Sequence, residues 1–150
     1  MRQPKQVLVF PYKKNSDGNY LYAIFCRVGS AERWQGIAGG VEEGETLLEA
    51  ARREAKEEAN ISLDAKVIPL ESVSTMPVVN VTKNFLWGND VLLIYEYAFG
   101  VDATNEEMRL SREHTKMEWL PYDEAIKKLK WDSNKNALWE LNYHLINNKY

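Results

Sequence analysis

Cysteine, histidine and long apolar runs are scarce in the sequence, and each scarcity excludes a class of protein or site. Its 150 residues contain one cysteine, Cys26, so no disulfide can form within the chain. The two histidines, His114 and His144, are too few and too far apart in sequence to form a zinc site. No apolar run approaches the roughly 20 residues that span a bilayer, and the run at residues 91–97 is interrupted by Glu96. Residues 1–5 lack the apolar stretch of a signal peptide. We therefore expect a cytoplasmic protein with no membrane segment.

Charge of one sign is also scarce. The 19 Lys and Arg residues oppose 22 Asp and Glu residues, giving a formal net charge of −3. A protein without a basic excess has no global field to hold a nucleic-acid backbone, so we expect no nucleic-acid partner. Any polyanion must be held by local groups. The composition, with 27% charged and 45% hydrophobic residues, is that of a globular protein, and the length suits one domain spanning residues 1–150.

Hydrophobic patterning predicts a mixed α/β domain. We expect strands at residues 6–12, 20–27, 61–76, 90–101 and 116–120, with a hairpin turn at Asp17-Gly18 between the first two. Helices are expected at residues 47–59, 123–129 and 133–146, the last with Ser133 as its N-cap. The glycine-rich residues 29–44 are expected to form a loop with brief extended pieces, and residues 77–89 an irregular stretch able to cover a binding cleft. Because strands and helices do not alternate strictly, a mixed sheet flanked by helices is predicted.

The helix predicted at residues 47–59 carries three glutamates close together. Glu54, Glu57 and Glu58 have spacings of three and four, so they fall within an arc of about 100° that borders the apolar side. An ordinary solvated acidic face is the alternative interpretation. Against it, the acids lie in the C-terminal half, where the helix dipole disfavours each by about 0.3–1 kcal/mol. A Mg²⁺ ion, which binds carboxylates and substrate phosphates, would remove their repulsion, so the glutamates and the preceding glycine-rich loop predict a metal and phosphate site.

Residues 39–61 resemble the signature of the Nudix (MutT-like) hydrolases. That signature reads Gly-x5-Glu-x7-Arg-Glu-U-x-Glu-Glu-x-Gly-U, where U is a bulky apolar residue. Its first glycine and five charged positions are matched by Gly39, Glu45, Arg53, Glu54, Glu57 and Glu58. Two positions differ: Ala55 stands at the bulky apolar position and Asn60 at the second glycine. Asparagine also tolerates the left-handed conformation of a helix C-cap.

The resemblance implies both a fold and a reaction. The fold is an α/β/α sandwich around a mixed sheet, and the reaction is Mg²⁺-dependent hydrolysis of a nucleoside diphosphate linked to another group, with Mn²⁺ as an alternative ion. Glu54, Glu57 and Glu58 would be metal ligands and catalytic residues, one of them helping to activate water. Glu45 and Arg53 would form an ion pair that fixes the loop against the helix.

A narrower resemblance covers most of the chain. Residues 34–46 and a C-terminal pattern that includes Arg112-Glu113-His114, Glu118-Trp119-Leu120 and Trp131 are similar to a Nudix branch, the bacterial dihydroneopterin triphosphate pyrophosphohydrolases. This branch also cleaves dATP and other nucleoside triphosphates. The resemblance implies that Glu113 joins the metal site, for which an exposed loop charge is the alternative. It also implies substrate contacts from Arg2, Arg27, Ala38 and Gly39, with Ala38 acting through its backbone.

These patterns predict a pyrophosphohydrolase that converts dihydroneopterin triphosphate, dATP or another dNTP to the monophosphate and pyrophosphate. Hydrolysis of dinucleoside polyphosphates, nucleotide sugars or oxidised dNTPs is the alternative within the enzyme class. A non-catalytic nucleotide-sensing Nudix module is a further alternative, which the intact set of acids disfavours. The partner is a small-molecule nucleotide or pterin triphosphate, and the protein is expected to be a monomer or homodimer. Trp34, Phe85 and Trp87 are candidates for stacking on the base, with core packing as the alternative.

Overall fold

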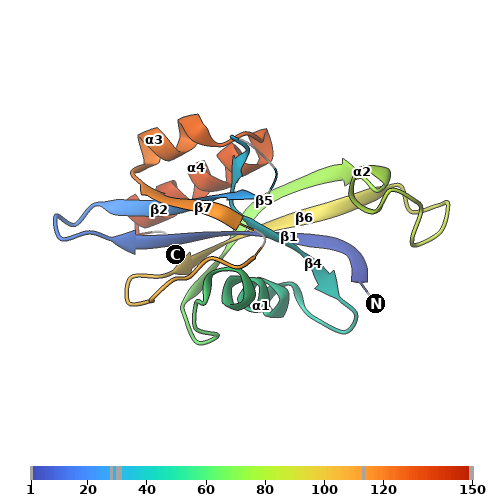
Figure 1. The fold of residues 1–150 in the computed structure, drawn as a ribbon, viewed down its shortest axis with the longest axis horizontal. Helices are drawn as coiled ribbons and strands as arrows, with labels where there is room; N and C mark the ends of the chain where they lie inside the picture. Colours follow the sequence, from blue (N-terminus) through green and yellow to red (C-terminus); the bar gives the residue numbers. More distant parts are fainter. Residues whose placement is uncertain (1, 28, 30–31, 113, 149–150) are drawn as a thin grey trace.

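The computed structural model describes residues 2–27, 29, 32–112 and 114–148, which form a single mixed α/β domain (Figure 1). The strands are β1 (Arg2–Lys14), β2 (Tyr20–Arg27), β3 (Trp34–Gln35), β4 (Ile37–Glu42), β5 (Val67–Pro77), β6 (Leu93–Asp102) and β7 (His114–Leu120). The helices are α1 (Leu47–Ala59), α2 (Val79–Thr82), α3 (Tyr122–Lys128) and α4 (Asp132–Ile146). All the strands join one sheet, with α1 on one face and α3 and α4 on the other. The predicted α/β/α sandwich is confirmed.

Strand β1 is the centre of this sheet, because three other strands pair with it. It runs parallel to β6 from Lys5 to Tyr12, antiparallel to β4 along its first half, and antiparallel to β2 at its last residues. Strand β5 extends the sheet beyond β6, and β3 and β7 both pair with β2. One parallel pair among antiparallel ones makes the sheet mixed, as predicted.

Alternating side chains of the sheet build a hydrophobic core on each face. In β1, Val7 and Val9 belong to the core beneath α1, whereas Leu8 and Phe10 belong to the core beneath α4, as the two-residue period of a strand requires. The fully buried side chains that helix α1 contributes to its core are all alanines, Ala50, Ala51, Ala55 and Ala59, and the partly buried Leu47 packs against this core. These alanines allow α1 to lie close to the sheet, which fits the small residue found at the bulky position of the signature.

The structure confirms the first hairpin and the most regular helix. Strands β1 and β2 pair across the turn that contains Asp17 and Gly18, where Gly18 has a φ of +83°. Helix α1 spans the predicted residues, and Cys26 is buried in the core.

Other predicted boundaries were wrong. Strand β1 begins at Arg2, four residues before the predicted start. Strand β5 begins only at Val67, because the preceding residues form a turn in which Ala65 N donates to Ser62 O over 3.1 Å. Ser133 is not an N-cap: α4 begins at Asp132, and its N-cap is Trp131, which makes no side-chain capping bond.

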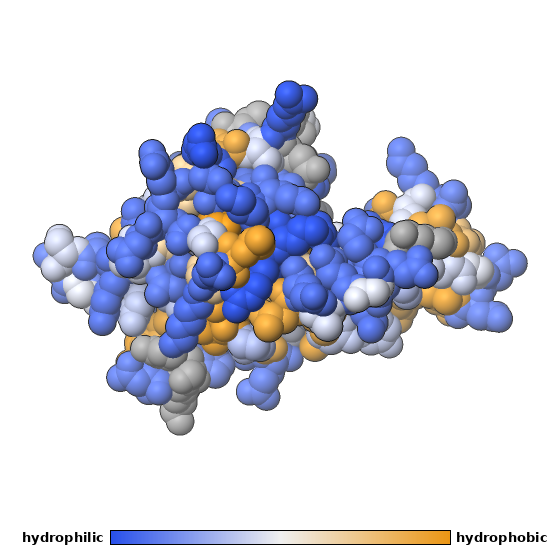
Figure 2. Space-filling view, turned by 90° about the horizontal axis from the view of Figure 1, so that it is seen from below, coloured by the Kyte–Doolittle hydropathy of each residue, from blue (hydrophilic) through white to orange (hydrophobic). Residues whose placement is uncertain are grey.

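The surface differs between the two ends of the molecule. Seen from the α1 side, polar side chains cover most of this face, and hydrophobic ones gather toward the end that carries α2 (Figure 2). Exposed hydrophobic residues of that region include Val79, Phe85, Leu86 and Leu92. In the part of the chain that the structure describes, no helix is long and apolar enough to cross a membrane.

Candidate active site

Both ends of α1 are capped, which fixes the helix that carries the glutamates. Thr46 is the N-cap, and it forms a capping box with Glu49: Glu49 N donates to Thr46 Oγ1 over 3.1 Å, and Thr46 N donates to Glu49 Oε1 over 2.9 Å. Asn60 is the C-cap, with a φ of +58° in the left-handed region. Asparagine therefore adopts the conformation that the family's glycine would supply at this position.

Arg53 connects α1 to the preceding loop and to the sheet. Its Nε donates to Glu45 Oε2 over 2.7 Å, and its Nη2 donates to Glu45 Oε1 over 2.9 Å and to Gly40 O over 2.8 Å. The hydrogen bonds from Arg53 hold the pKa of Glu45 below its ordinary value, and the same bonds raise the pKa of Arg53. This bidentate ion pair and the bond to Gly40 O form a clamp that holds the loop, the helix and β4 together.

The three glutamates of α1 lie in different environments. Glu54 and Glu58 are 7% and 6% exposed, whereas the side chain of Glu57 is open to solvent. Arg53 Nη1 donates to Glu54 Oε1 over 2.8 Å and to Glu57 Oε2 over 3.3 Å. Burial raises the pKa of Glu54 to about 7, and the charges of Glu57 and Glu58 add to this shift while Arg53 opposes it. The helix thus places three carboxylates of different burial close together.

Glu58 is held by the segment that leads into β7. Ser111 Oγ donates to Glu58 Oε2 over 2.6 Å, and Nδ1 of the buried His114 lies 3.3 Å from the same oxygen. The backbone follows the same path, since Ser111 N donates to Glu58 O over 3.0 Å. Glu113, which the sequence nominated for the metal site, lies outside the described residues, but its neighbours on this segment contact Glu58.

The chemistry of this donor set fits a hard divalent cation. Carboxylate oxygens are the ligands that Mg²⁺ and similar ions prefer, and a nearby cation would reverse the rise in the pKa of Glu54. Among the described residues, no three His, Cys, Asp or Glu side chains are gathered closely enough to hold a metal as they stand. The glutamates are instead engaged by Arg53, Ser111 and His114, so the ion would displace or rearrange these contacts.

Two glycines that were expected in a loop lie inside strand β4. Neither Gly39 nor Gly40 has a positive φ; both are needed because other side chains occupy the space of a Cβ. A Cβ on Gly39 would overlap the carboxyl group of Glu54, and a Cβ on Gly40 would overlap the guanidinium of Arg2. Residues 29–44 were expected to be a loop with brief extended pieces, and Gly39 and Gly40 lie in one such piece, where they allow close approach of other side chains rather than a turn.

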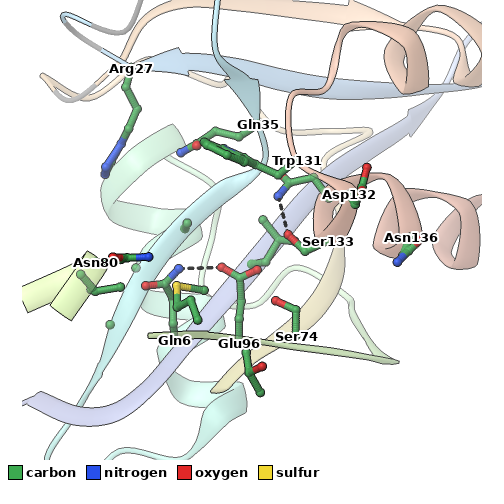
Figure 3. Close-up of a pocket in the computed structure, with 18 of the residues that line it drawn as sticks. Gln6, Arg27, Gln35, Ser74, Asn80, Glu96, Trp131, Asp132, Ser133 and Asn136 are labelled. Carbon is green, nitrogen blue, oxygen red and sulfur yellow. Dashed lines mark hydrogen bonds between the residues drawn. The ribbon is translucent and has the colours of Figure 1, made fainter. Parts of the chain in front are cut away.

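A cavity of about 890 Å³ opens beside these glycines (Figure 3). Its lining includes all four residues that the sequence nominated for substrate contacts, namely Arg2, Arg27, Ala38 and Gly39. Figure 3 shows Arg27 reaching toward the cavity from β2. Asn80 and Val81 also line it, so the segment at residues 77–89 flanks the cavity, through α2. Since Gly39 both lines the cavity and touches Glu54, the cavity borders the glutamate helix.

A row of polar residues crosses the floor of this cavity. Strand pairing aligns Gly40 of β4, Gln6 of β1, Glu96 of β6 and Ser74 of β5. Arg2 Nη2 donates to Gln6 Oε1 over 3.1 Å, and Gln6 Nε2 donates to Glu96 Oε2 over 2.6 Å. Glu96 is 6% exposed, and its burial raises its pKa despite the bond from Gln6.

The aromatic residues proposed for stacking do not line the cavity. Trp34 is buried in the core next to α4, and Trp87 instead donates from Nε1 to Arg2 O over 2.7 Å. Phe85 is exposed elsewhere on the surface. The aromatic side chain that lines the cavity is Trp131, which is 45% exposed and lies opposite Gln6 and Glu96 in Figure 3.

Comparison with known proteins assigns this architecture to a family. A model of the NUDIX domain matches residues 5–140. The chain belongs to the NUDIX family. A Listeria monocytogenes protein assigned to the NUDIX hydrolases has a solved structure that is 39% identical, with a TM-score of 0.87 over 97% of each chain.

Two further comparisons concern Escherichia coli. The dihydroneopterin triphosphate diphosphatase of strain K12 is 27% identical to this NUDIX chain over 139 residues, or 91% of each protein. The structure of the E. coli dihydroneopterin triphosphate pyrophosphohydrolase is 25% identical, with a TM-score of 0.75 over 94% of this chain and 97% of that one. The protein is therefore a Nudix hydrolase, and enzymes of this family generally use divalent metal ions.

Sequence reasoning missed the polar floor of the cavity. Gln6 and Glu96 are 90 residues apart, and only the parallel pairing of β1 with β6 brings them together. One signal was available: Glu96 is the charged residue within the otherwise apolar run at residues 91–97. A carboxylate in such a strand either lies at an edge of the sheet or is buried together with a partner group.

Proposed function

We propose that this Nudix hydrolase is a Mg²⁺-dependent pyrophosphohydrolase of dihydroneopterin triphosphate or a dNTP such as dATP. The observation that carries the proposal is the position of Gly39, which lines the cavity on one side and touches the Glu54 carboxyl on the other. A substrate with its heterocycle in the cavity would bring its phosphates to the glutamates. The names of the two E. coli relatives support a pterin or nucleoside triphosphate as the substrate.

Charge explains why a cation must accompany the substrate. A triphosphate brings about four negative charges to a protein that already carries −3, so binding without a cation is unfavourable. Bound Mg²⁺ would supply charge neutralisation and a more acidic water. Glu54, Glu57 and Glu58 would hold it, joined by Glu113, and Mn²⁺ is an alternative ion with the same ligand preference.

The remaining residues would position the substrate. Arg27 would pair with phosphate oxygens, and the clamp between Glu45 and Arg53 keeps α1 seated against β4. Water then bonds to the α-phosphorus while the bond to the bridging oxygen breaks. The products are a monophosphate and pyrophosphate, with the proton of the water passing to a carboxylate such as Glu58.

The test is a substrate panel with product identification. Purified protein is incubated with Mg²⁺ and dihydroneopterin triphosphate, dATP, a dinucleoside polyphosphate, a nucleotide sugar and an oxidised dNTP. We expect pyrophosphate and the monophosphate from the first two substrates. Release of orthophosphate, or cleavage of the last three substrates alone, would assign the protein to another class of Nudix hydrolase. No cleavage of any member would refute the proposed hydrolysis and favour the non-catalytic alternative.

Two other expectations remain predictions. We propose a cytoplasmic location, which suits a chain with a single cysteine. Light scattering on the purified protein determines whether its oligomeric state is a monomer or a homodimer.

A further inference from the structure

The floor of the cavity holds a carboxylate whose environment calls for a ligand. Glu96 is 94% buried within the sheet, and among the described residues the hydrogen bond to its side chain comes from Gln6. A carboxylate has about four acceptor sites on its two oxygens, so most of its capacity is unused. Glu96 lines the cavity, so acceptor sites that Gln6 does not use can receive hydrogen bonds from a ligand bound there.

A relay of two hydrogen bonds, from Arg2 to Gln6 and from Gln6 to Glu96, fixes the orientation of this carboxylate. The Arg2 guanidinium can only donate, so the bond from Nη2 forces Gln6 to present its carbonyl oxygen to Arg2. The amide nitrogen of Gln6 must then point to Glu96, where it donates to Oε2. Oε1 of Glu96 is left for the cavity. The relay therefore determines that a ligand in the cavity meets Oε1 of Glu96.

The surroundings fit a flat heterocycle. Trp131 lines the same cavity from the start of α4 and lies opposite Glu96 in the view of Figure 3. An aromatic side chain can stack on any base without reading its identity. One base must therefore be distinguished from another at the edge of its ring, where the carboxylate oxygens of Glu96 accept hydrogen bonds.

We propose that Glu96, aligned by Gln6 and Arg2, selects the heterocycle of the substrate by accepting hydrogen bonds from a ring N–H and an adjacent exocyclic NH2 group. Guanine and pterin both present this pair of donors, whereas adenine presents a ring nitrogen acceptor beside its amino group. The inference rests on the proposed function and narrows it. Guanine nucleotides and pterins are preferred over adenine nucleotides, and dATP becomes a poor substrate.

The Glu96→Gln variant gives a directional test. Gln6 still donates to position 96, so the new amide must place its oxygen toward Gln6 and its NH2 group toward the cavity. The atom that faces the ligand changes from acceptor to donor with no change in shape. This variant should reject the guanine edge and accept the ring nitrogen of adenine.

The experiment measures kcat/KM for dGTP, dITP and dATP with wild-type protein and three variants. Wild type should prefer dGTP to dATP by at least about tenfold, with dITP between them because it lacks the amino group. Glu96→Gln should shift the ratio of dGTP to dATP by about tenfold or more toward dATP. Glu96→Asp keeps the acceptors and should keep the preference while lowering both values. Glu71→Gln, an exposed carboxylate on β5, is the matched control and should change nothing.

Equal losses for all three substrates in Glu96→Gln and Glu96→Asp would show a purely structural role and overturn the proposal. A wild-type protein without preference between dGTP and dATP would also overturn it.

Equilibrium binding of dGMP and dAMP separates this inference from the proposed function, because it needs no turnover. Hydrolysis without discrimination refutes the inference alone. Preferential binding of dGMP that Glu96→Gln reverses, in a protein that hydrolyses nothing, supports the inference and refutes the proposed activity. Equal binding of dGMP and dAMP by such a protein refutes both.

Discussion

At the scale of single residues, this site depends on where side chains are missing. Gly39 and Gly40 remove two side chains from the strand that separates the cavity from α1. The carboxyl of Glu54 fills the first space and the guanidinium of Arg2 fills the second. A glycine in a strand normally weakens it, so Gly39 trades stability of β4 for contact with the helix, and Gly40 trades it for contact with Arg2 of β1.

The first prediction concerns Gly39→Ala. Because a Cβ here would overlap the Glu54 carboxyl, that side chain must move and α1 must shift. We expect a free energy of unfolding lower by about 1–3 kcal/mol, measured in urea, and a loss of hydrolysis. In a Glu54→Ala background, the same glycine change should cost clearly less stability. An additive double mutant would mean that the two residues do not interact.

The second prediction concerns Glu58→Gln. The amide keeps an acceptor for Ser111, so the fold should be preserved, but it cannot supply negative charge to a cation or take a proton. We expect turnover to fall by roughly 10² to 10⁴-fold with an unchanged thermal midpoint. Glu107→Gln is the matched control, since this exposed carboxylate lies beside the end of the same helix. Unchanged turnover in Glu58→Gln would remove Glu58 from the metal site.

For the contacts of single residues in the site, the Nudix signature was informative, and the rest of the sequence was less informative. The clamp between Glu45 and Arg53 was expected because the resemblance to the Nudix signature implies an ion pair between these two positions. The contacts of Glu58 with Ser111 and His114 were not, because they depend on how a distant loop folds back over the end of α1.

At the scale of elements, α4 is tied to the sheet by one glutamate. Glu140 accepts from Glu71 N over 2.5 Å, from Ser72 N over 2.9 Å and from Ser72 Oγ over 2.6 Å. Burial alone would raise the pKa of Glu140, but these bonds outweigh burial and lower it. The negative charge thus completes the backbone bonding of β5 where α4 crosses it.

The third prediction follows from that lowered pKa. A carboxyl group whose pKa is lower in the folded state stabilises the fold above its ordinary pKa, and the effect disappears as the pH falls through the folded value. Glu140→Gln should therefore lower the free energy of unfolding by about 1–2 kcal/mol near pH 7 and by less near pH 3. Urea unfolding at both pH values checks this. Glu71→Gln leaves the backbone N–H in place and should be neutral, and a pH-independent loss in Glu140→Gln would argue against a charge effect.

Elements were predicted well where local signals sufficed. Helix α1 has strong helix formers, a capping box and a left-handed cap residue, so its bounds could be read directly. Strand β4 was expected only as an unplaced extended piece of a loop, because Gly36, Gly39 and Gly40 suggested loop structure, whereas these glycines make room for side chains of other elements. The start of α4 was misplaced because no side chain caps it.

At the scale of the whole molecule, α1 and α4 lie on opposite faces of the sheet, and α4 lines the cavity directly with residues of its first turn, including Ser133 and Asn134. Helix α1 borders the cavity through Gly39, which lines the cavity and packs against the Glu54 carboxyl. The fold class was predictable from the pattern of elements. The cavity was not, because it forms where β1, β4, β5 and β6 lie side by side with α2 and the start of α4.

The fourth prediction concerns metal binding by the intact protein. An ion that binds only the folded state stabilises it by about 2.7 kcal/mol at 100 times its dissociation constant. Mg²⁺ should therefore raise the thermal midpoint of wild type by several degrees, and EDTA should abolish the rise. The triple variant E54Q/E57Q/E58Q should show no such rise, whereas Glu107→Gln should behave as wild type. An equal rise in the triple variant would place the ion elsewhere.

The position of β1 also decides how the protein can be handled. Arg2, the first residue of β1, lines the cavity, so a tag fused ahead of it emerges beside the opening. Helix α4 begins at the cavity but has 15 residues, so its far end lies about 22 Å from its first turn. Immobilisation through the end of α4 therefore leaves substrate access unobstructed, whereas a leading affinity tag competes with substrate for the entrance.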